Sequence, residues 1–365
     1  MKEICIDVRM AFNSGIGTYV RNIVSLLKSG PFNIKLIATA EIIKKWPALA
    51  SFDLILTSAP LYSIQEQIQF PFLVPSCDLF WTPHYNIPLF PIRAKKRITT
   101  IHDVYHLAYG KILSLPKRLY AKAVIKGAAT ISDHIITDST FSKEEIIKYT
   151  NTSQNKITVI SLGVDKGLFS AKAEPVLLEQ IRAKYQLPDR YFLFVSTLAP
   201  HKNVDRLLRA WNILAKNYPD WKLVLVGKHV KNQSWQSVID QNSLLQQQVM
   251  FLQQVDNEDL PILYQLAYGA IHPSLYEGFG LPPLEAMSSG CPVVVSKIAS
   301  LPEVCGDSAV YVDPYDAADM AAGMQKMIED QSLYHELKAK GLQRSANFTW
   351  EKTAAKHIEI LEKFA

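Results

Sequence analysis

Short apolar runs rich in β-branched residues alternate along the chain with longer segments whose apolar positions recur at helical spacing. Alternation of this kind is typical of βα units and of a mostly parallel sheet. Strands are expected at residues 3–8, 34–38, 53–56, 78–83, 97–103, 134–139 and 156–161, then at 191–197, 221–227, 249–255, 270–274, 292–296 and 309–314. The pattern therefore predicts an α/β protein.

The alternation breaks once, over residues 170–190, and then restarts. We place a domain boundary there and predict two Rossmann-like parallel-sheet domains, residues 1–168 and 169–349, that face a cleft. Residues 350–365 have helical spacing and follow the second domain, so we expect them to pack back on the first. Ligands of parallel sheets bind beyond the carboxyl ends of the strands, so functional residues are sought at those ends.

Composition changes this picture little. The 365 residues are 48% hydrophobic and 20% charged, a globular composition of sufficient length for two domains. No apolar run resembles a signal peptide or a membrane span, which predicts a cytoplasmic protein. The four cysteines lack the spacing of a zinc site or a disulfide framework, so we expect buried thiols and no metal.

Charge is distributed unevenly along the chain. Residues 1–168 carry 20 Lys and Arg against 12 Asp and Glu, whereas the remainder carries 19 against 22. A basic half is either a solvated face or a surface that attracts anionic lipid or a phosphate-bearing acceptor. No nucleic-acid recognition motif accompanies the charge. We therefore expect peripheral contact with the inner face of a membrane and no nucleic-acid partner.

The stretch SLYEGFGLPPLEAMSSGCPVVVS places Glu277 and Glu285 on either side of a Gly-Phe-Gly turn and a Pro-Pro pair. Glycines permit close backbone approach, and prolines are tolerated at the start of a helix. A helix N-terminus at a strand end offers N–H groups and a positive dipole to phosphate. We expect Glu285 in the first helical turn and both carboxylates on sugar hydroxyls. Alternatively, Glu285 complements the dipole and Glu277 is a surface residue.

Two further strand ends carry candidate phosphate ligands. Lys202 follows one strand and precedes an amphipathic helix that Asn203 is expected to cap; it is a phosphate partner or a surface charge. Gly15 and Gly17 follow the first strand, but Val20 stands where the dinucleotide fingerprint needs a third glycine. Closure of the cleft would bring their backbone N–H groups to the same pyrophosphate.

These segments together resemble the retaining glycosyltransferases of family 4, which have the GT-B fold. Glu277 and Glu285 match the paired glutamates of that family seven residues apart, and the likeness covers nearly the whole chain. The other matching segments are SGIGTYVRNIV, TIHDVYHL, DSTFSKEEII, ISLGVD, TLAPHKN and SLPEVCGDSAVYVDP.

The resemblance implies a role for each matching residue. Glu285 would bind the ribose of a sugar nucleotide, Glu277 the donor hexose, and His102 would lie against the transferred sugar. The remaining matches would hold the diphosphate: Lys202 and the backbone of Gly278, Phe279, Gly280 and Leu281, helped by Gly15 and Gly17.

The chain departs from the family pattern at two places. Relatives have an arginine five residues before the lysine or directly before it, where this chain has Thr197 and His201. One fixed cation is therefore missing, and His201 or Arg206 would have to compensate. A glycine usual near the nucleobase is Gln253 here, which leaves the base open.

The implied activity is metal-independent, retaining hexosyl transfer by front-face attack, in which the departing phosphate takes the acceptor's proton. Donors fixed on that phosphate stabilise the developing negative charge. The likeness favours mannose from GDP-mannose over a UDP-sugar, with no separate cofactor. The acceptor would be a saccharide or lipid-linked saccharide in bacterial surface polysaccharide (lipopolysaccharide) assembly.

Three other classes of protein are alternatives to a family 4 glycosyltransferase. A nicotinamide-dependent oxidoreductase requires the fingerprint that Val20 breaks. A phosphorylase of the same fold would need a Schiff-base lysine and a longer chain. A non-catalytic sugar-nucleotide-binding subunit of a glycosyltransferase complex is favoured by the missing arginine and opposed by the intact Lys202, Glu277 and Glu285.

Overall fold

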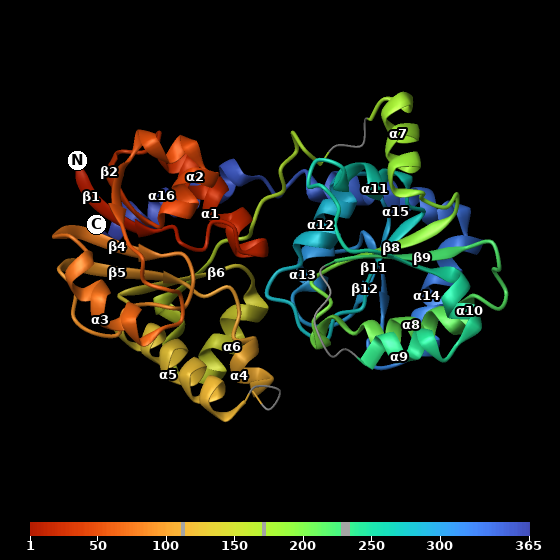
Figure 1. Ribbon diagram of the computed structural model, residues 1–365, viewed down its shortest axis with the longest axis horizontal. Helices are drawn as coiled ribbons and strands as arrows, with labels where there is room; N and C mark the ends of the chain where they lie inside the picture. Colours follow the sequence, from red (N-terminus) through yellow and green to blue (C-terminus); the bar gives the residue numbers. More distant parts are fainter. Residues whose placement is uncertain (111–113, 170–172, 228–233) are drawn as a thin grey trace. The chain divides into compact units, whose positions relative to one another are not determined.

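The computed structural model describes residues 1–110, 114–169, 173–227 and 234–365 (Figure 1). The described residues form two compact units. The first comprises residues 1–163 together with 350–365, and the second comprises residues 164–349. The sequence places the boundary a few residues later, after residue 168, and the break that it identifies falls partly on 170–172, outside the described residues.

The first unit is built on a seven-stranded parallel sheet of order β3-β2-β1-β4-β5-β6-β7. The first strand of the chain, β1, pairs with β2 on one side and β4 on the other, with Ile4 beside Ile34 of β2 and Leu79 of β4. The strands are β1 (Lys2–Asp7), β2 (Phe32–Ala38), β3 (Asp53–Leu56), β4 (Cys77–Thr82), β5 (Ala94–Thr100), β6 (His134–Thr137) and β7 (Ile157–Val159).

Helices cover both faces of this sheet (Figure 1). α1, α2 and α16 lie on one face, and α3, α5 and α6 lie on the other. The helices are α1 (Ser14–Leu27), α2 (Ala40–Lys45), α3 (Ile64–Leu73), α4 (Tyr105–Ala108), α5 (Leu115–Ile131), α6 (Thr140–Thr150) and α16 (Trp350–Phe364), with short 3-10 turns at Pro47–Ser51 and Gln154–Lys156. The terminal helix α16 is fixed to α1 by a buried hydrogen bond between Tyr19 Oη and His357 Nε2.

The second unit has a six-stranded parallel sheet of order β10-β9-β8-β11-β12-β13. Its strands are β8 (Tyr191–Val195), β9 (Lys222–Val226), β10 (Val249–Leu252), β11 (Gly269–His272), β12 (Val293–Ser296) and β13 (Ala309–Val312). All of β12 is buried, as expected for a strand covered on both faces. Every strand range predicted from the sequence overlaps one of these strands, so the predicted fold class is confirmed.

The helices of the second unit connect these strands. They are α7 (Pro175–Tyr185), α8 (Val204–Leu214), α9 (Ser234–Asp240), α10 (Ser243–Gln248), α11 (Leu260–Leu266), α12 (Leu281–Ser288), α13 (Leu301–Cys305), α14 (Ala317–Glu329) and α15 (Gln331–Ser345), with a 3-10 turn, η4, at Pro200–Lys202. Leu207, Leu208 and Trp211 of α8 are fully buried against the sheet. The four cysteines are free and buried, as predicted.

Asn203 does not cap α8 with its side chain, contrary to the sequence-based expectation. It adopts the left-handed conformation, with φ 66°, between η4 and α8. Its buried amide nitrogen donates to the carbonyl oxygens of Pro273, at 3.0 Å, and Pro314, at 2.6 Å. Asn203 therefore ties together the segments that follow β8, β11 and β13, at the carboxyl edge of the sheet.

We expect Asn203→Ala to lower the free energy of unfolding of the second unit by about 3 kcal/mol, because two buried carbonyls lose their donor. The matched control is Asn151→Ala, at an exposed left-handed residue that ends α6, which should cost about 1 kcal/mol from backbone strain alone. Hydrogen exchange in urea measures both losses of unfolding free energy. It is followed at the backbone amides of the strands in the unit that carries each substitution. Equal losses would contradict the bridging role.

Candidate active site

Lys202 and Glu277 meet at the carboxyl edge of the second sheet. Lys202 ends the 3-10 turn after β8, and Glu277 follows β11. The ammonium Nζ lies 2.6 Å from Glu277 Oε1, and each side chain is 14% exposed. The hydroxyl of Ser274 donates to the same carboxylate oxygen at 2.8 Å. The sequence predicts that Lys202 binds phosphate and that Glu277 binds a sugar. In the structure these two residues are paired with each other.

Glu277 is held in its charged form. Burial alone would raise the pKa of Glu277, but the Lys202 ammonium and the hydrogen bonds from Lys202 and Ser274 outweigh it and lower that pKa below its ordinary value. His201 lies close enough to lower the pKa of Glu277 further. The site therefore presents a fixed carboxylate and a fixed ammonium side by side.

The turn after Glu277 has a backbone that only glycine can supply. Gly280 has φ +113°, and a Cβ there would lie 2.7 Å from a side-chain carbon of Leu301. The hydroxyl of Ser300 shares its single hydrogen between the carbonyls of Glu277, at 3.0 Å, and Phe279, at 2.7 Å. The Phe279 ring is buried and packs edge-on to Phe348. Both the side chain and the carbonyls of the turn are therefore fixed by the unit's own core.

The start of α12 lies where the sequence predicts it, at the Pro-Pro pair. The helix begins at Leu281, and Pro282 and Pro283 occupy its next two positions, so neither contributes an N–H group. Leu284 gives its N–H to the carbonyl of Gly280 at 3.4 Å. Backbone donors for an anion are thus limited to the Gly278–Leu281 segment, while the helix dipole remains available.

Glu285 is the fifth residue of α12 and lies in its second turn, so its predicted place in the first turn is wrong. Two proline positions and Leu284 separate it from the turn. Burial raises the pKa of Glu285 to about 7. A carboxyl whose pKa is raised this far by lost hydration is a candidate for a functional residue.

His102 lies in the first unit, just after β5. Its Nδ1 is 2.7 Å from Asp138 Oδ2, and its Nε2 is 3.0 Å from the carbonyl oxygen of Pro83. Since both partners accept hydrogen bonds, the arrangement favours a ring protonated on both nitrogens. Burial opposes that charge, but Asp138 outweighs it and raises the pKa of His102. A histidine held this way is poorly suited to act as a general base.

Gly15 and Gly17 lie in the first turn of α1, and Gly17 has a packing role of its own. A Cβ at Gly17 would lie 2.6 Å from the carbonyl oxygen of Ala11. Its N–H donates to the carbonyl of Asn13 at 3.0 Å, within the helix. Tyr19, two residues on, packs edge-on to the His102 ring with centroids 4.8 Å apart. The roles of these glycines and of His102 toward a donor stay predictions.

The two cations proposed to compensate for the missing arginine have different surroundings. His201 accepts a hydrogen bond from the backbone of Leu275 through its carbonyl at 2.7 Å, beside the Glu277 segment. Arg206 donates to Asn203 Oδ1 at 3.1 Å and lies over the Tyr315 ring. Gln253 is exposed after β10. Arg206 is thus engaged by Asn203 and Tyr315, whereas His201 lies beside the segment that carries Glu277.

Three residues that hold the candidate residues in place were not predicted from the sequence: Ser274 and Ser300 in the second unit and Asp138 in the first. Ser274 stands three residues before Glu277, a spacing at which a serine hydroxyl can reach the carboxylate, so that signal was available. The contacts of Ser300 and Asp138 join segments more than twenty residues apart. Only the fold brings these together.

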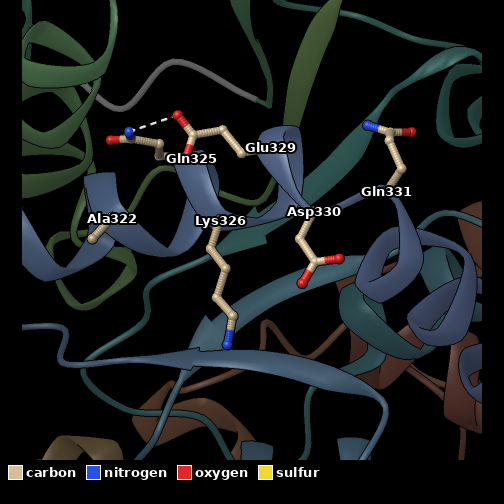
Figure 2. Close-up of a pocket in the computed structure, with 6 residues that line it drawn as sticks. All are labelled: Ala322, Gln325, Lys326, Glu329, Asp330 and Gln331. Carbon is tan, nitrogen blue, oxygen red and sulfur yellow. Dashed lines mark hydrogen bonds between the residues drawn. The ribbon is translucent and has the colours of Figure 1, made fainter.

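A surface pocket of about 580 Å³ lies elsewhere in the second unit, at the end of α14 (Figure 2). Gln325 donates to Glu329 there at 2.8 Å, and Glu329 also accepts from Tyr218, which precedes β9. The pocket is therefore at the amino edge of the sheet, opposite to Lys202 and Glu277. Its lining residues are Ala322, Gln325, Lys326, Glu329, Asp330 and Gln331.

Within the ranges that the structure describes, no group of three or more His, Cys, Asp and Glu side chains is arranged to hold a metal ion. Over the same ranges, no helix has the length and apolar character needed to span a bilayer.

These features define the class of protein. It has two parallel-sheet units, and the second carries the ammonium of Lys202, the carboxylate of Glu277 and a glycine turn at the ends of its strands. Two family descriptions match the chain in line with this class. Residues 14–167 match Glycosyltransferase Family 4, and residues 179–344 match Glycosyl transferases group 1.

Proteins named as mannosyltransferases also match the chain in sequence. The O-antigen chain mannosyltransferase B of Escherichia coli is 33% identical over 286 residues, 75% of this chain and 72% of that protein. The serotype-specific mannosyltransferase WbdA of Escherichia coli is 32% identical over 231 residues, 62% of this chain. The match spans only 28% of the length of WbdA. The chain belongs to glycosyltransferase family 4, which confirms the predicted family.

Solved structures agree on the fold. Anabaena Alr3699/HepE in complex with UDP-glucose has a TM-score of 0.80 at 18% identity, and 100% of each chain is covered. Sucrose-phosphate synthase from Thermosynechococcus elongatus has a TM-score of 0.79 at 20% identity, over 100% of this chain and 99% of that one.

The raised pKa of Glu285 predicts that the stability of the fold depends on pH. The Glu285 pKa of about 7 in the folded state exceeds the ordinary 4.5, so between those values the folded protein holds a proton that the unfolded chain releases. Stability should therefore fall as pH rises through this window, by roughly 3 kcal/mol in all. Glu285→Gln lacks this fall, so it should be more stable than the wild type near pH 8 and about equal near pH 5.

Thermal unfolding across this pH range measures the difference. The control is Glu179→Gln, which makes the same change of charge on exposed α7 and should leave the pH dependence of the wild type intact. An identical pH dependence in Glu285→Gln and the wild type would contradict a buried, proton-binding carboxyl.

Proposed function

We propose that the chain transfers mannose from GDP-mannose to a saccharide or lipid-linked saccharide acceptor, with retention and without a metal, in the assembly of a bacterial surface polysaccharide. Two mannosyltransferases of Escherichia coli that match at 32 to 33% identity support the sugar and the process. We favour GDP over UDP as the nucleotide, because the family resemblance implies GDP as the carrier of mannose.

The Lys202–Glu277 pair is the observation that carries this proposal. It places an ammonium and a carboxylate 2.6 Å apart at strand ends, where ligands of parallel sheets bind. A sugar nucleotide presents both complementary groups, since its diphosphate is anionic and its hexose is rich in hydroxyl donors. In our account Lys202 exchanges Glu277 for the diphosphate, and Glu277 exchanges Lys202 for hexose hydroxyls.

Leaving-group stabilisation follows from that exchange. As the anomeric bond breaks, negative charge grows on the departing phosphate, and a fixed cation stabilises this state more than the bound donor. Backbone N–H groups of the Gly278–Leu281 segment would add donors, and the dipole of α12 would add to the field. His201, beside Glu277, is our candidate for the cation that replaces the missing arginine.

Glu285 would bind the ribose. Its raised pKa is a consequence of lost hydration, and ribose hydroxyls would return the hydrogen bonds that water no longer supplies. The ionised carboxylate accepts two such bonds, so donor binding would lower the pKa of Glu285.

In the first unit, His102 is assigned to the orientation of the transferred sugar, and Gly15 and Gly17 to the diphosphate. The contacts of His102 with Asp138 and Pro83 support a positively charged ring that is not a base. The acceptor's proton would therefore leave with the phosphate, by front-face attack. The basic charge of residues 1–168 supports an acceptor met at the cytoplasmic face of a membrane.

A non-catalytic sugar-nucleotide-binding subunit is the second candidate. Thr197 and His201, in place of the family's arginine, favour it. Such a protein would bind GDP-mannose with Lys202 and Glu277 but release no GDP from it.

We expect Lys202→Ala to lower turnover of GDP-mannose by about 100- to 1,000-fold, because the departing phosphate loses its cation. GDP release, measured with octyl α-mannoside as acceptor, follows the reaction. UDP-glucose tests the donor and should be turned over at least about tenfold more slowly than GDP-mannose, a difference of roughly 1.4 kcal/mol in activation free energy.

Lys184→Ala is the matched control. Lys184 lies in the same unit and pairs with Asp259 at the same 2.6 Å, but on an exposed surface away from the glycine turn. Its turnover should equal that of the wild type. Near-normal turnover by Lys202→Ala would refute its role, and no GDP release by the wild type would favour the non-catalytic candidate.

A further inference from the structure

Helix α3 is oriented with its charged residue inward and three of its large apolar side chains outward. Glu66 is 1% exposed, whereas Ile64, Ile68 and Phe72 are 77%, 59% and 76% exposed. These three residues are spaced four apart and form one stripe along the helix. The other strongly exposed side chains of α3, Gln65 and Gln69, are uncharged. The whole outer surface of this helix therefore lacks charge.

Buried contacts lock the helix in this orientation. Glu66 forms an ion pair with Arg9 and accepts hydrogen bonds from Asn86 Nδ2, at 2.6 Å, and the backbone of Tyr62, at 2.9 Å. A roll of α3 that buried the isoleucines would expose or break this buried pair, at a high cost. The exposed stripe is thus a fixed feature of the first unit.

More apolar surface adjoins the stripe. A shallow groove of about 390 Å³ runs between α3 and the end of the edge strand β3, and Leu56, Ile68 and Phe72 line it together. Leu56 is itself exposed. Isolated exposed apolar residues are ordinary, but a contiguous group of this size marks an interaction surface.

Basic residues border this group at one end. Arg93 Nη2 donates to the carbonyl oxygen of Phe72 at 2.7 Å, so its guanidinium lies at the end of α3. Lys95, two residues on, is exposed and forms an ion pair with Asp78 at 2.8 Å. Arg97 donates to the carbonyl of the exposed Phe90 at 2.8 Å, in the segment between β4 and β5 that Gln67 of α3 also contacts. Cations therefore flank exposed aromatic rings.

We infer that the α3 stripe, Ile64, Ile68 and Phe72 with Leu56, docks the protein on an anionic lipid surface. The inference rests on the proposed function in one respect: the lipid surface is where the lipid-linked acceptor of the proposed reaction would be met. Apolar side chains enter the boundary of the acyl chains while adjacent Arg and Lys bind headgroups, and the two contributions add. A second copy of this chain fits less well, since a two-fold interface would set the same cations against each other.

Vesicle co-sedimentation of the full chain tests the inference. The double variant Ile68→Ser/Phe72→Ser should bind vesicles of phosphatidylcholine with about 30% phosphatidylglycerol at least roughly tenfold more weakly than the wild type. Arg93→Gln should weaken binding about fivefold at low salt, and the wild type should bind vesicles of pure phosphatidylcholine more weakly.

Val176→Ser/Leu177→Ser is the matched control, because it removes two exposed apolar side chains from α7 of the second unit. It should bind as the wild type does. Equal binding by the stripe variant and the wild type would overturn the inference. So would light scattering that shows a wild-type dimer converted to a monomer by the stripe variant, since a second copy would then cover the surface.

Two readouts separate this inference from the proposed function. The melting temperature of the stripe variant should match that of the wild type, because the substituted side chains are exposed. Its GDP release with soluble octyl α-mannoside, without vesicles, should be unchanged. Loss of vesicle binding with intact turnover supports docking alone, whereas wild-type vesicle binding without any turnover refutes only the proposed enzyme.

Discussion

The ion pair of Lys202 and Glu277 is the interaction on which the second unit's site depends. Two charges removed from most of their water must be paired and hydrogen-bonded, or the fold loses several kcal/mol. The surrounding contacts meet that condition: Ser274 supplies a further hydrogen bond, and Asn203 joins the segments that carry the pair. The glycine turn is held from the other side by Ser300. The site is therefore rigid before any ligand arrives.

This rigidity has a consequence for recognition. A diphosphate that approaches Lys202 competes with a carboxylate already in contact with it, so an anion alone gains little from the ammonium. A sugar nucleotide also brings hydroxyls that satisfy Glu277 as Lys202 leaves it. On the proposed function, the pair would discriminate for ligands that carry both groups, because either group by itself leaves one buried charge without its partner.

The sequence predicted the strands well because β-branched runs buried on both faces, such as Val293–Val295, have no alternative at that length. It also placed Lys202 and Glu277 at the same edge, since parallel strands end together. It failed where a side chain's partner is distant in sequence. The capping predicted for Asn203 and the first-turn position of Glu285 were wrong, and nothing local indicated that Glu66 of α3 would face inward to meet Arg9. Such contacts depend on the fold, so they could not be read from a local pattern.

Calorimetric titration of the Glu277→Gln variant with GDP and with GDP-mannose tests the exchange of partners most directly. If Lys202 is released from its carboxylate, GDP should bind the variant at least as tightly as it binds the wild type, while GDP-mannose, deprived of a hydroxyl acceptor, should bind at least about tenfold more weakly. Equal weakening of both ligands, or no change in either, would contradict the account.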